Sequence, residues 1–123
     1  MPELPDICVY IDAIESRIAD KPLQRIQVLS PFFLRTAEPP VSDVEGQRVT
    51  TLRRLGKRVA IGFENDLWLV IHLMIAGRFQ WRDGPPAPRK PNRNTLAVLN
   101  FEHGALILTE AGSKKRASLH VVD

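Results

Sequence analysis

Hydrophobic periodicity divides the chain into a helical start and a strand-rich remainder. Four isoleucines recur at spacings of four, three and four residues between Ile7 and Ile18, which places them on one face of a helix. Pro5 suits a first helical turn, and Pro22 prevents the helix from continuing. The first 22 residues therefore predict one amphipathic helix whose isoleucine stripe packs against the core.

Beyond Pro22 the apolar residues alternate with polar ones or form short runs separated by turn residues. A short helix is expected at Val41–Val44, the proline-rich segment Asp83–Asn94 is expected to be a surface loop, and a last apolar patch covers Leu119–Val122. Closely spaced strands without long helices between them favour an antiparallel sandwich or barrel. The expected strands are Leu23–Leu29, Phe32–Arg35, Arg48–Leu55, Lys57–Phe63, Leu67–Leu73, Gly77–Trp81, Thr95–Phe101 and Ala105–Thr109.

The predicted fold class is mainly β with flanking helices (α+β), an antiparallel β-sandwich with a leading N-terminal α-helix. A length of 123 residues accommodates one domain with one core. Seventeen Lys and Arg against 14 Asp and Glu leave a net charge of +3, which permits an anionic partner without identifying one.

Cysteine and hydropathy content narrow the class of protein further. A single cysteine, Cys8, excludes an internal disulfide framework and a multi-cysteine zinc site within the chain, and we expect it to pack on the leading helix. No secretion signal precedes the helix, and no apolar run approaches the roughly 20 residues that span a bilayer. The expectation is a soluble cytoplasmic protein with no membrane contact.

The most informative chemistry lies at Met1-Pro2-Glu3. Removal of Met1 would expose Pro2 as a secondary amine, and an α-amino group titrates near pH 8, so that a useful fraction is unprotonated at neutral pH. Such an amine can attack an electrophilic carbon and form an iminium, and a carboxyl such as Glu3 could move protons beside it. On these residues alone, the favoured interpretation is that Pro2 and Pro5 simply begin a helix, and the chemical interpretation depends on further matches along the chain.

Three segments resemble the formamidopyrimidine-DNA glycosylase/endonuclease VIII family. Met1–Asp6 resembles the family's opening Met-Pro-Glu-Leu-Pro-Glu, and Val49–Lys57 is similar to its stretch that ends in a β-turn lysine. Ile71–Phe79 is similar to its His-Leu-Gly-Met-Ser-Gly segment. The resemblance implies that residues 1–123 form the N-terminal catalytic domain of a bifunctional DNA glycosylase/AP lyase of base-excision repair. A monomer that acts on damaged double-stranded DNA in the nucleoid is then expected.

Three residues carry the chemistry that the resemblance implies. Pro2 would be the nucleophile on the sugar C1′ and would displace an oxidised base, leaving a Schiff base. Glu3 would shuttle protons as the sugar opens, and Lys57 would bind a phosphate beside the lesion. Strand cleavage by β- and δ-elimination would follow. His72, in contrast, is expected to be a hydrogen-bonded sheet residue rather than a catalytic base, and both tryptophans are expected in the core or at its rim.

The expected DNA-binding residues depart from the family's pattern. Met74 stands where Gly is usual, and Ile75 stands where a void-filling Met is usual. Lys114, Lys115 and Arg116 fall where many members carry Asp-x-Arg-Arg-Phe-Gly, whose Arg and Phe wedge into the duplex. We expect this basic run to contact phosphates, and a solvated charged turn remains an open alternative. Because the wedge residues are absent, the family's lesion and opposite-base preferences are not carried over to this chain.

Complete members of the family continue into a helix–two-turn–helix domain and usually a zinc or zincless finger, both absent from residues 1–123. No metal site or cofactor is therefore expected in this chain, although a zinc ion could belong to a missing C-terminal finger. The isolated piece is expected to bind DNA weakly and to be inactive. Two alternatives stay open: a catalytically inactive DNA-binding or structural module of the same fold, and an N-terminal-proline tautomerase.

Overall fold

The structure, a computed structural model, describes residues 4–30, 32–74, 76–84, 94–111 and 116–123, with the backbone alone for residues 4–6. No helix in these ranges is long and apolar enough to cross a membrane. The elements, in chain order, are α1 (Leu4–Ile18), β1 (Arg25–Val28), the 3-10 helix η1 (Val41–Val44), β2 (Val49–Leu55), β3 (Arg58–Phe63), β4 (Trp68–His72), β5 (Gly77–Asp83), β6 (Thr95–Phe101), β7 (Gly104–Glu110) and β8 (Ser118–Val122).

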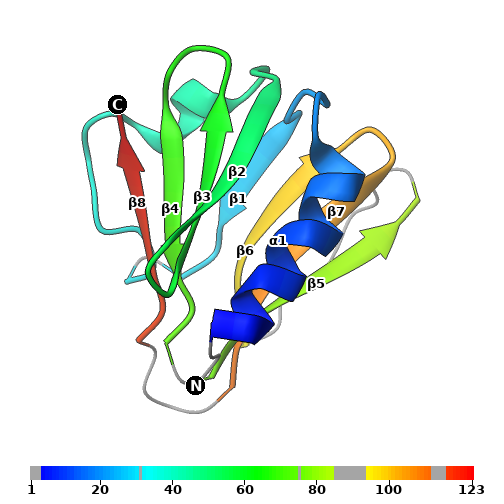
Figure 1. Cartoon of the computed structure of the whole chain (residues 1–123). Coiled ribbons are helices and arrows are strands. Elements are labelled where there is room, and N and C mark those ends of the chain that lie inside the picture. The colour runs from blue at the N-terminus through cyan, green and yellow to red at the C-terminus, as the bar shows by residue number, and fades with distance from the viewer. Residues whose placement is uncertain (1–3, 31, 75, 85–93, 112–115) are drawn as a thin grey trace.

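The strands form two four-stranded antiparallel sheets, which confirms the predicted sandwich with a leading helix. One sheet has the order β1-β6-β7-β5 and the other the order β2-β3-β4-β8. Figure 1 shows the two sheets one beside the other, with α1 running along the side where β2 and β5 are the edge strands. The ring of Tyr10 in α1 meets that of Phe79 in β5 at 5.4 Å between centroids, and α1 also contacts β2 and β3. The helix therefore closes one open edge of the sandwich.

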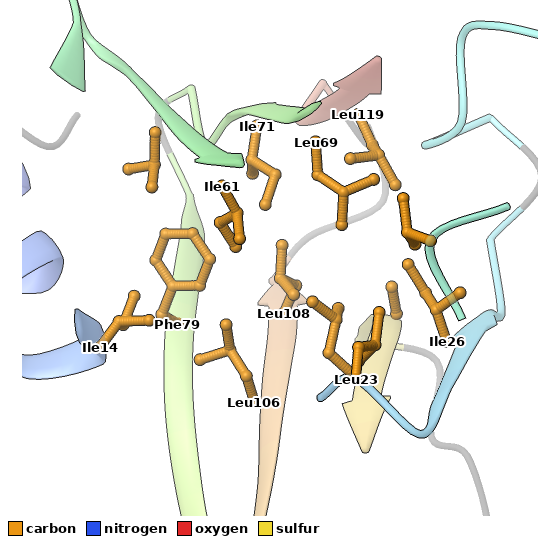
Figure 2. Close-up of a cluster of buried hydrophobic side chains, with 14 of the residues drawn as sticks. Ile14, Leu23, Ile26, Ile61, Leu69, Ile71, Phe79, Leu106, Leu108 and Leu119 are labelled. Carbon is orange, nitrogen blue, oxygen red and sulfur yellow. The ribbon is translucent and has the colours of Figure 1, made fainter. Parts of the chain in front are cut away.

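The core fills the space between the sheets. Figure 2 shows Ile61, Leu69 and Ile71 of one sheet facing Leu106 and Leu108 of the other. Each such side chain contributes about 1.5–3 kcal/mol when it is fully removed from water. The predicted isoleucine stripe of α1 joins this core. Ile7, Ile14 and Ile18 are buried, and Ile11 is partly buried.

Two expectations about the elements and their packing were wrong. Phe32–Arg35 is not a strand: only Leu34 forms an isolated parallel bridge, with Leu119. The Leu119 N–H donates to the Phe33 carbonyl at 2.8 Å and the Arg35 N–H donates to the Leu119 carbonyl at 2.9 Å, so this segment covers the edge strand β8. Cys8 is exposed rather than packed, because the helix turns it away from the isoleucine stripe.

Candidate nucleic-acid interface

One end of the sandwich collects most of the described residues that the sequence marked as functional. The register pairs Arg58 with His72 and His72 with Ser118, so the β2–β3 turn, the end of β4 and the start of β8 meet there. Gly77 pairs with Glu110, which brings the start of β5 and the end of β7 to the same end. In Figure 1 this end is the lower one, where the N-terminal end of α1 also lies. We call it the Lys57 end.

Lys57 lies in the tight turn that joins β2 to β3, as predicted for a β-turn lysine. Gly56 has φ +63° and allows the left-handed conformation that the turn requires. The Arg54 Nη1 donates to the Gly56 carbonyl oxygen at 3.0 Å, which fixes the turn. The half-buried Lys57 side chain is thus presented on a well-defined backbone, beside the first residue of β3, Arg58.

His72 combines burial with a positive surrounding. It projects from the outer face of β4, and within the described residues its buried Nε2 has no hydrogen-bond partner, contrary to the expected hydrogen-bonded role. Burial lowers the pKa of His72 below its usual 6.5, and the charges of Arg58 and Lys57 lower this pKa further. A neutral imidazole beside two cations suits an anion such as phosphate. The oxygens of the anion can accept a hydrogen bond from each of the three side chains.

The β4–β5 connection is held in a strained conformation. Met74 has φ +60°, which an L residue with a side chain rarely adopts, at the position where the family pattern has Gly. The Gly77 N–H donates to the Leu73 carbonyl at 3.0 Å, and a Cβ on Gly77 would lie 2.3 Å from that carbonyl oxygen. Only glycine therefore fits at position 77. Ile75 lies outside the described residues.

Glu110 is a site residue that sequence reasoning missed. It is 1% exposed and is the one buried charged side chain in the described part of the chain. Its carboxylate accepts the Arg116 N–H at 2.8 Å and the Ala117 N–H at 3.0 and 3.2 Å. Glu110 at the end of β7 therefore anchors the backbone of Arg116 and Ala117, the two residues before β8. An acidic residue at the end of an otherwise apolar strand was the available signal.

The expected site residues thus divide into two groups. Lys57, Met74 and the exposed Arg116 come together at the Lys57 end, Arg116 because it precedes the strand that pairs with His72. Pro2, Glu3, Lys114 and Lys115 lie outside the described residues. Within the described ranges, no three His, Cys, Asp or Glu side chains gather into a possible metal site.

Sequence comparison decides the family. Residues 1–117 match the family model described as the formamidopyrimidine-DNA glycosylase N-terminal domain. The chain belongs to this family. Named relatives are the formamidopyrimidine-DNA glycosylases of Protochlamydia amoebophila, 31% identical over 107 residues, and of Mycoplasma genitalium, 26% identical over 107 residues. The matches cover 85% of this chain but only 38% and 37% of these relatives, so the chain spans less than half of their length.

Solved structures agree on the fold of this glycosylase domain. A Lactococcus lactis formamidopyrimidine-DNA glycosylase bound noncovalently to DNA with an AP site superposes with a TM-score of 0.83, at 21% identity, over 98% of this chain and 45% of that one. A complex of a mutant of that enzyme family with THF-containing DNA gives a TM-score of 0.85 at 22% identity, over 98% of this chain and 43% of the other. The two-sheet sandwich with a leading helix is therefore the fold of a DNA-repair glycosylase N-terminal domain.

Proposed function

We propose that this chain provides the catalytic end of a bifunctional DNA glycosylase/AP lyase that removes oxidised bases in base-excision repair. The observation that carries the proposal is a group of side chains at the Lys57 end that suits an anion: the charges of Lys57 and Arg58 act on His72, whose Nε2 has no hydrogen-bond partner within the described residues. Figure 1 shows the N-terminal end of α1 at this same end, and Pro2 is two residues before that helix begins. The residues that bind phosphate and the proposed nucleophile would thus act on the same DNA strand.

In the proposed reaction, the Pro2 nitrogen attacks the sugar C1′ and the bond to the damaged base breaks. The base leaves with a proton. The Pro2 nitrogen then loses its own proton as the sugar ring opens, and an iminium between this nitrogen and C1′ remains. Glu3 protonates the ring oxygen as the ring opens. The iminium acidifies the adjacent C2′–H, and removal of that proton expels the 3′ phosphate by β-elimination. The conjugated iminium that results acidifies C4′–H, and removal of this second proton expels the 5′ phosphate by δ-elimination. The target base must first leave the duplex stack.

The DNA contacts of the domain follow from the same end. Lys57 would bind a phosphate next to the lesion, and Arg116, with Lys114 and Lys115, would bind others. Met74 and Ile75 would lie nearest the space that the extruded base vacates. The solved neighbours that are complexes with damaged DNA support DNA as the partner. We propose a monomer that works in the nucleoid of the cytoplasm.

Borohydride trapping on DNA that contains an abasic site tests this function in the full-length protein. We expect a covalent protein–DNA adduct, its loss in Pro2→Gly, and an intact mass that lacks Met1, because an acylated Pro2 could not attack. Lys57→Gln should weaken the adduct without changing the fold. Absence of an adduct in a folded protein would favour the inactive module, and proton transfer to a keto–enol substrate without DNA cross-linking would favour the tautomerase.

The isolated 123-residue chain should bind duplex DNA weakly and in a salt-sensitive way, with little activity. Fewer phosphate contacts mean lower affinity and a shallower dependence on salt. A filter-binding series in salt measures both quantities, and nanomolar binding at physiological salt would contradict the expectation.

A further inference from the structure

The outer face of the β2-β3-β4-β8 sheet continues away from the Lys57 end as a strip without acidic residues. Along β4, Leu69 and Ile71 point into the core, so Trp68, Val70 and His72 point outward. The register aligns the outward positions of the other three strands with these three residues. None of the outward positions on the four fully described strands is Asp or Glu, whereas Arg53, Arg58, His72 and His120 are among them.

Within this strip, Arg53 is held in place by an aromatic stack. Its guanidinium carbon lies over the ring of Trp68, 5.5 Å from the centroid. On β3, Gly62 pairs with Trp68, and a Cβ on this glycine would come within 2.9 Å of the indole ring, so the ring packs against the bare backbone. This cation–π contact restrains the guanidinium while the side chain stays exposed. The planar fork of an ordered arginine suits a phosphate, and less side-chain entropy is lost on binding.

The strip is continuous with the proposed phosphate site. Arg58 is the residue that follows Lys57, and it pairs with His72. On β2, Arg53 stands two positions from Leu55, which pairs with Arg58, a separation of about 7 Å along the strand. Acidic residues next to this sheet lie at the opposite end: Glu64 and Asp66 in the β3–β4 turn, and Asp123 directly after β8. The positive charge therefore runs in one direction, from the Lys57 turn onto the sheet face.

We propose that this outer face is a further contact surface for a single DNA strand, in which Arg58 and the stacked Arg53 bind successive phosphates of the strand that passes Lys57. The proposal rests on the proposed function, because it extends the phosphate contacts of that site. The positive charge of this face and its continuity with the Lys57 end favour a polyanionic strand over a protein partner. A basic peptide would not bind here, because the face carries exposed arginines and no carboxylate.

Two matched double variants of the 123-residue chain, whose two sheets and α1 share one core, test the surface. Arg53→Gln with Arg58→Gln removes the strip's arginines, and Arg25→Gln with Arg82→Gln removes two exposed arginines from the outer face of the other sheet. Binding of a labelled single-stranded oligonucleotide is followed by fluorescence anisotropy at several salt concentrations. We expect the first pair to make the slope of log Kobs against log salt shallower by about 1.4, since each phosphate contact on a single strand contributes about 0.7, and the second pair to leave it nearly unchanged.

Equal effects of the two pairs, or no effect of the first pair, would overturn the proposal. Lys57→Gln separates it from the proposed function. If Lys57→Gln weakens oligonucleotide binding and the Arg53/Arg58 double variant does not, only the proposal for the sheet surface is overturned. If neither variant weakens binding, the proposed function is overturned as well.

Trp68 supplies a direct reporter that does not depend on charge removal. The chain has two tryptophans, so Trp81→Phe leaves Trp68 as the only indole. We expect its emission to change when the oligonucleotide binds, and Gly62→Ala, which displaces the ring, to reduce the affinity. Unchanged emission while anisotropy reports binding would contradict the proposal, as would an emission change with protein concentration alone, because a second copy would then cover the face.

Discussion

The two ends of the sandwich use polar groups in opposite ways. At the end away from Lys57, the Trp81 Nε1–H donates to Asp83 at 2.7 Å, and the His103 Nε2–H donates to the Arg17 carbonyl at 2.6 Å. The Arg17 guanidinium lies 5.9 Å from the Trp81 ring centroid. At the Lys57 end, by contrast, a buried imidazole nitrogen has no partner within the described residues, and Met74 occupies a left-handed conformation. At the far end these polar groups are paired. At the Lys57 end the paired carboxylate of Glu110 also stabilises the fold, but a strained backbone and an unmet imidazole nitrogen lie at the same end, where a ligand would bind.

The largest effect on this comparison is expected from Glu110→Ala. The substitution leaves the buried Ala117 N–H and the part-buried Arg116 N–H without their acceptor. A buried donor without a partner costs about 1–3 kcal/mol and a part-buried one less, so we expect a loss of about 2–4 kcal/mol in the free energy of unfolding. Urea denaturation measures it. Glu110→Gln, which keeps one acceptor oxygen, should lose less. A change below about 0.5 kcal/mol for the alanine variant would show that Glu110 does not hold the loop.

His103→Ala should destabilise the opposite end by about 1 kcal/mol. It removes one hydrogen bond to the Arg17 carbonyl and the contact with the Trp81 ring, 5.2 Å away between centroids. Binding of DNA should be unchanged, because this end is remote from Lys57. Thermal unfolding and anisotropy on the same variant check the two statements, and a loss of DNA affinity without a loss of stability would reverse the roles of the two ends.

Met74→Gly should raise the free energy of unfolding by about 0.5–1 kcal/mol. The left-handed conformation costs about 1–2 kcal/mol for a residue with a side chain, and glycine's greater freedom in the unfolded chain offsets part of the gain. Val70→Gly, at an extended strand position, is the matched control and should destabilise. A loss of stability in Met74→Gly would mean that the packing of this half-buried side chain outweighs its backbone strain.

The smallest expected effect is a pH dependence from His72. Because its pKa in the folded state is lowered, the unfolded chain binds more protons below the usual value of 6.5. Stability is therefore fully present above pH 6.5 and falls as the pH drops from there through the lowered pKa. His72→Asn should make the curve of unfolding free energy against pH flatter in this window. An identical slope in both proteins would show that the imidazole titrates as it does in water.

Much of the architecture could be predicted because local patterns dictate it. The isoleucine stripe predicted α1, and Thr95–Phe101 was predicted with the bounds that β6 has. The expectations about local structure that were wrong concern segments whose conformation depends on partners far along the chain. The segment around Leu34 is apolar like a strand but meets only one residue of an edge, and Leu119–Val122 became β8 because it completes the sheet beside β4.

The site was predictable where a motif marks it and not where burial defines it. Lys57 sits in its turn as the motif indicates. The carboxylate of Glu110 and the Nε2 of His72, which no described residue bonds, acquire their importance only from what surrounds them in three dimensions, and no spacing in the sequence reveals this.

The imidazoles of the chain offer the most direct test of whether the Lys57 end binds DNA phosphates. The sequence contains three histidines, His72, His103 and His120, and their ring proton resonances can be titrated by NMR with and without a short duplex that contains an abasic site. A phosphate beside Lys57 and Arg58 would offset the charges that lower the pKa of His72, so this pKa should rise in the complex, whereas DNA should leave the ring proton resonances of His103 at the remote end unshifted. If DNA binds and the pKa of His72 does not move, or if the resonances of His103 shift as much as those of His72, the Lys57 end is not where the DNA lies.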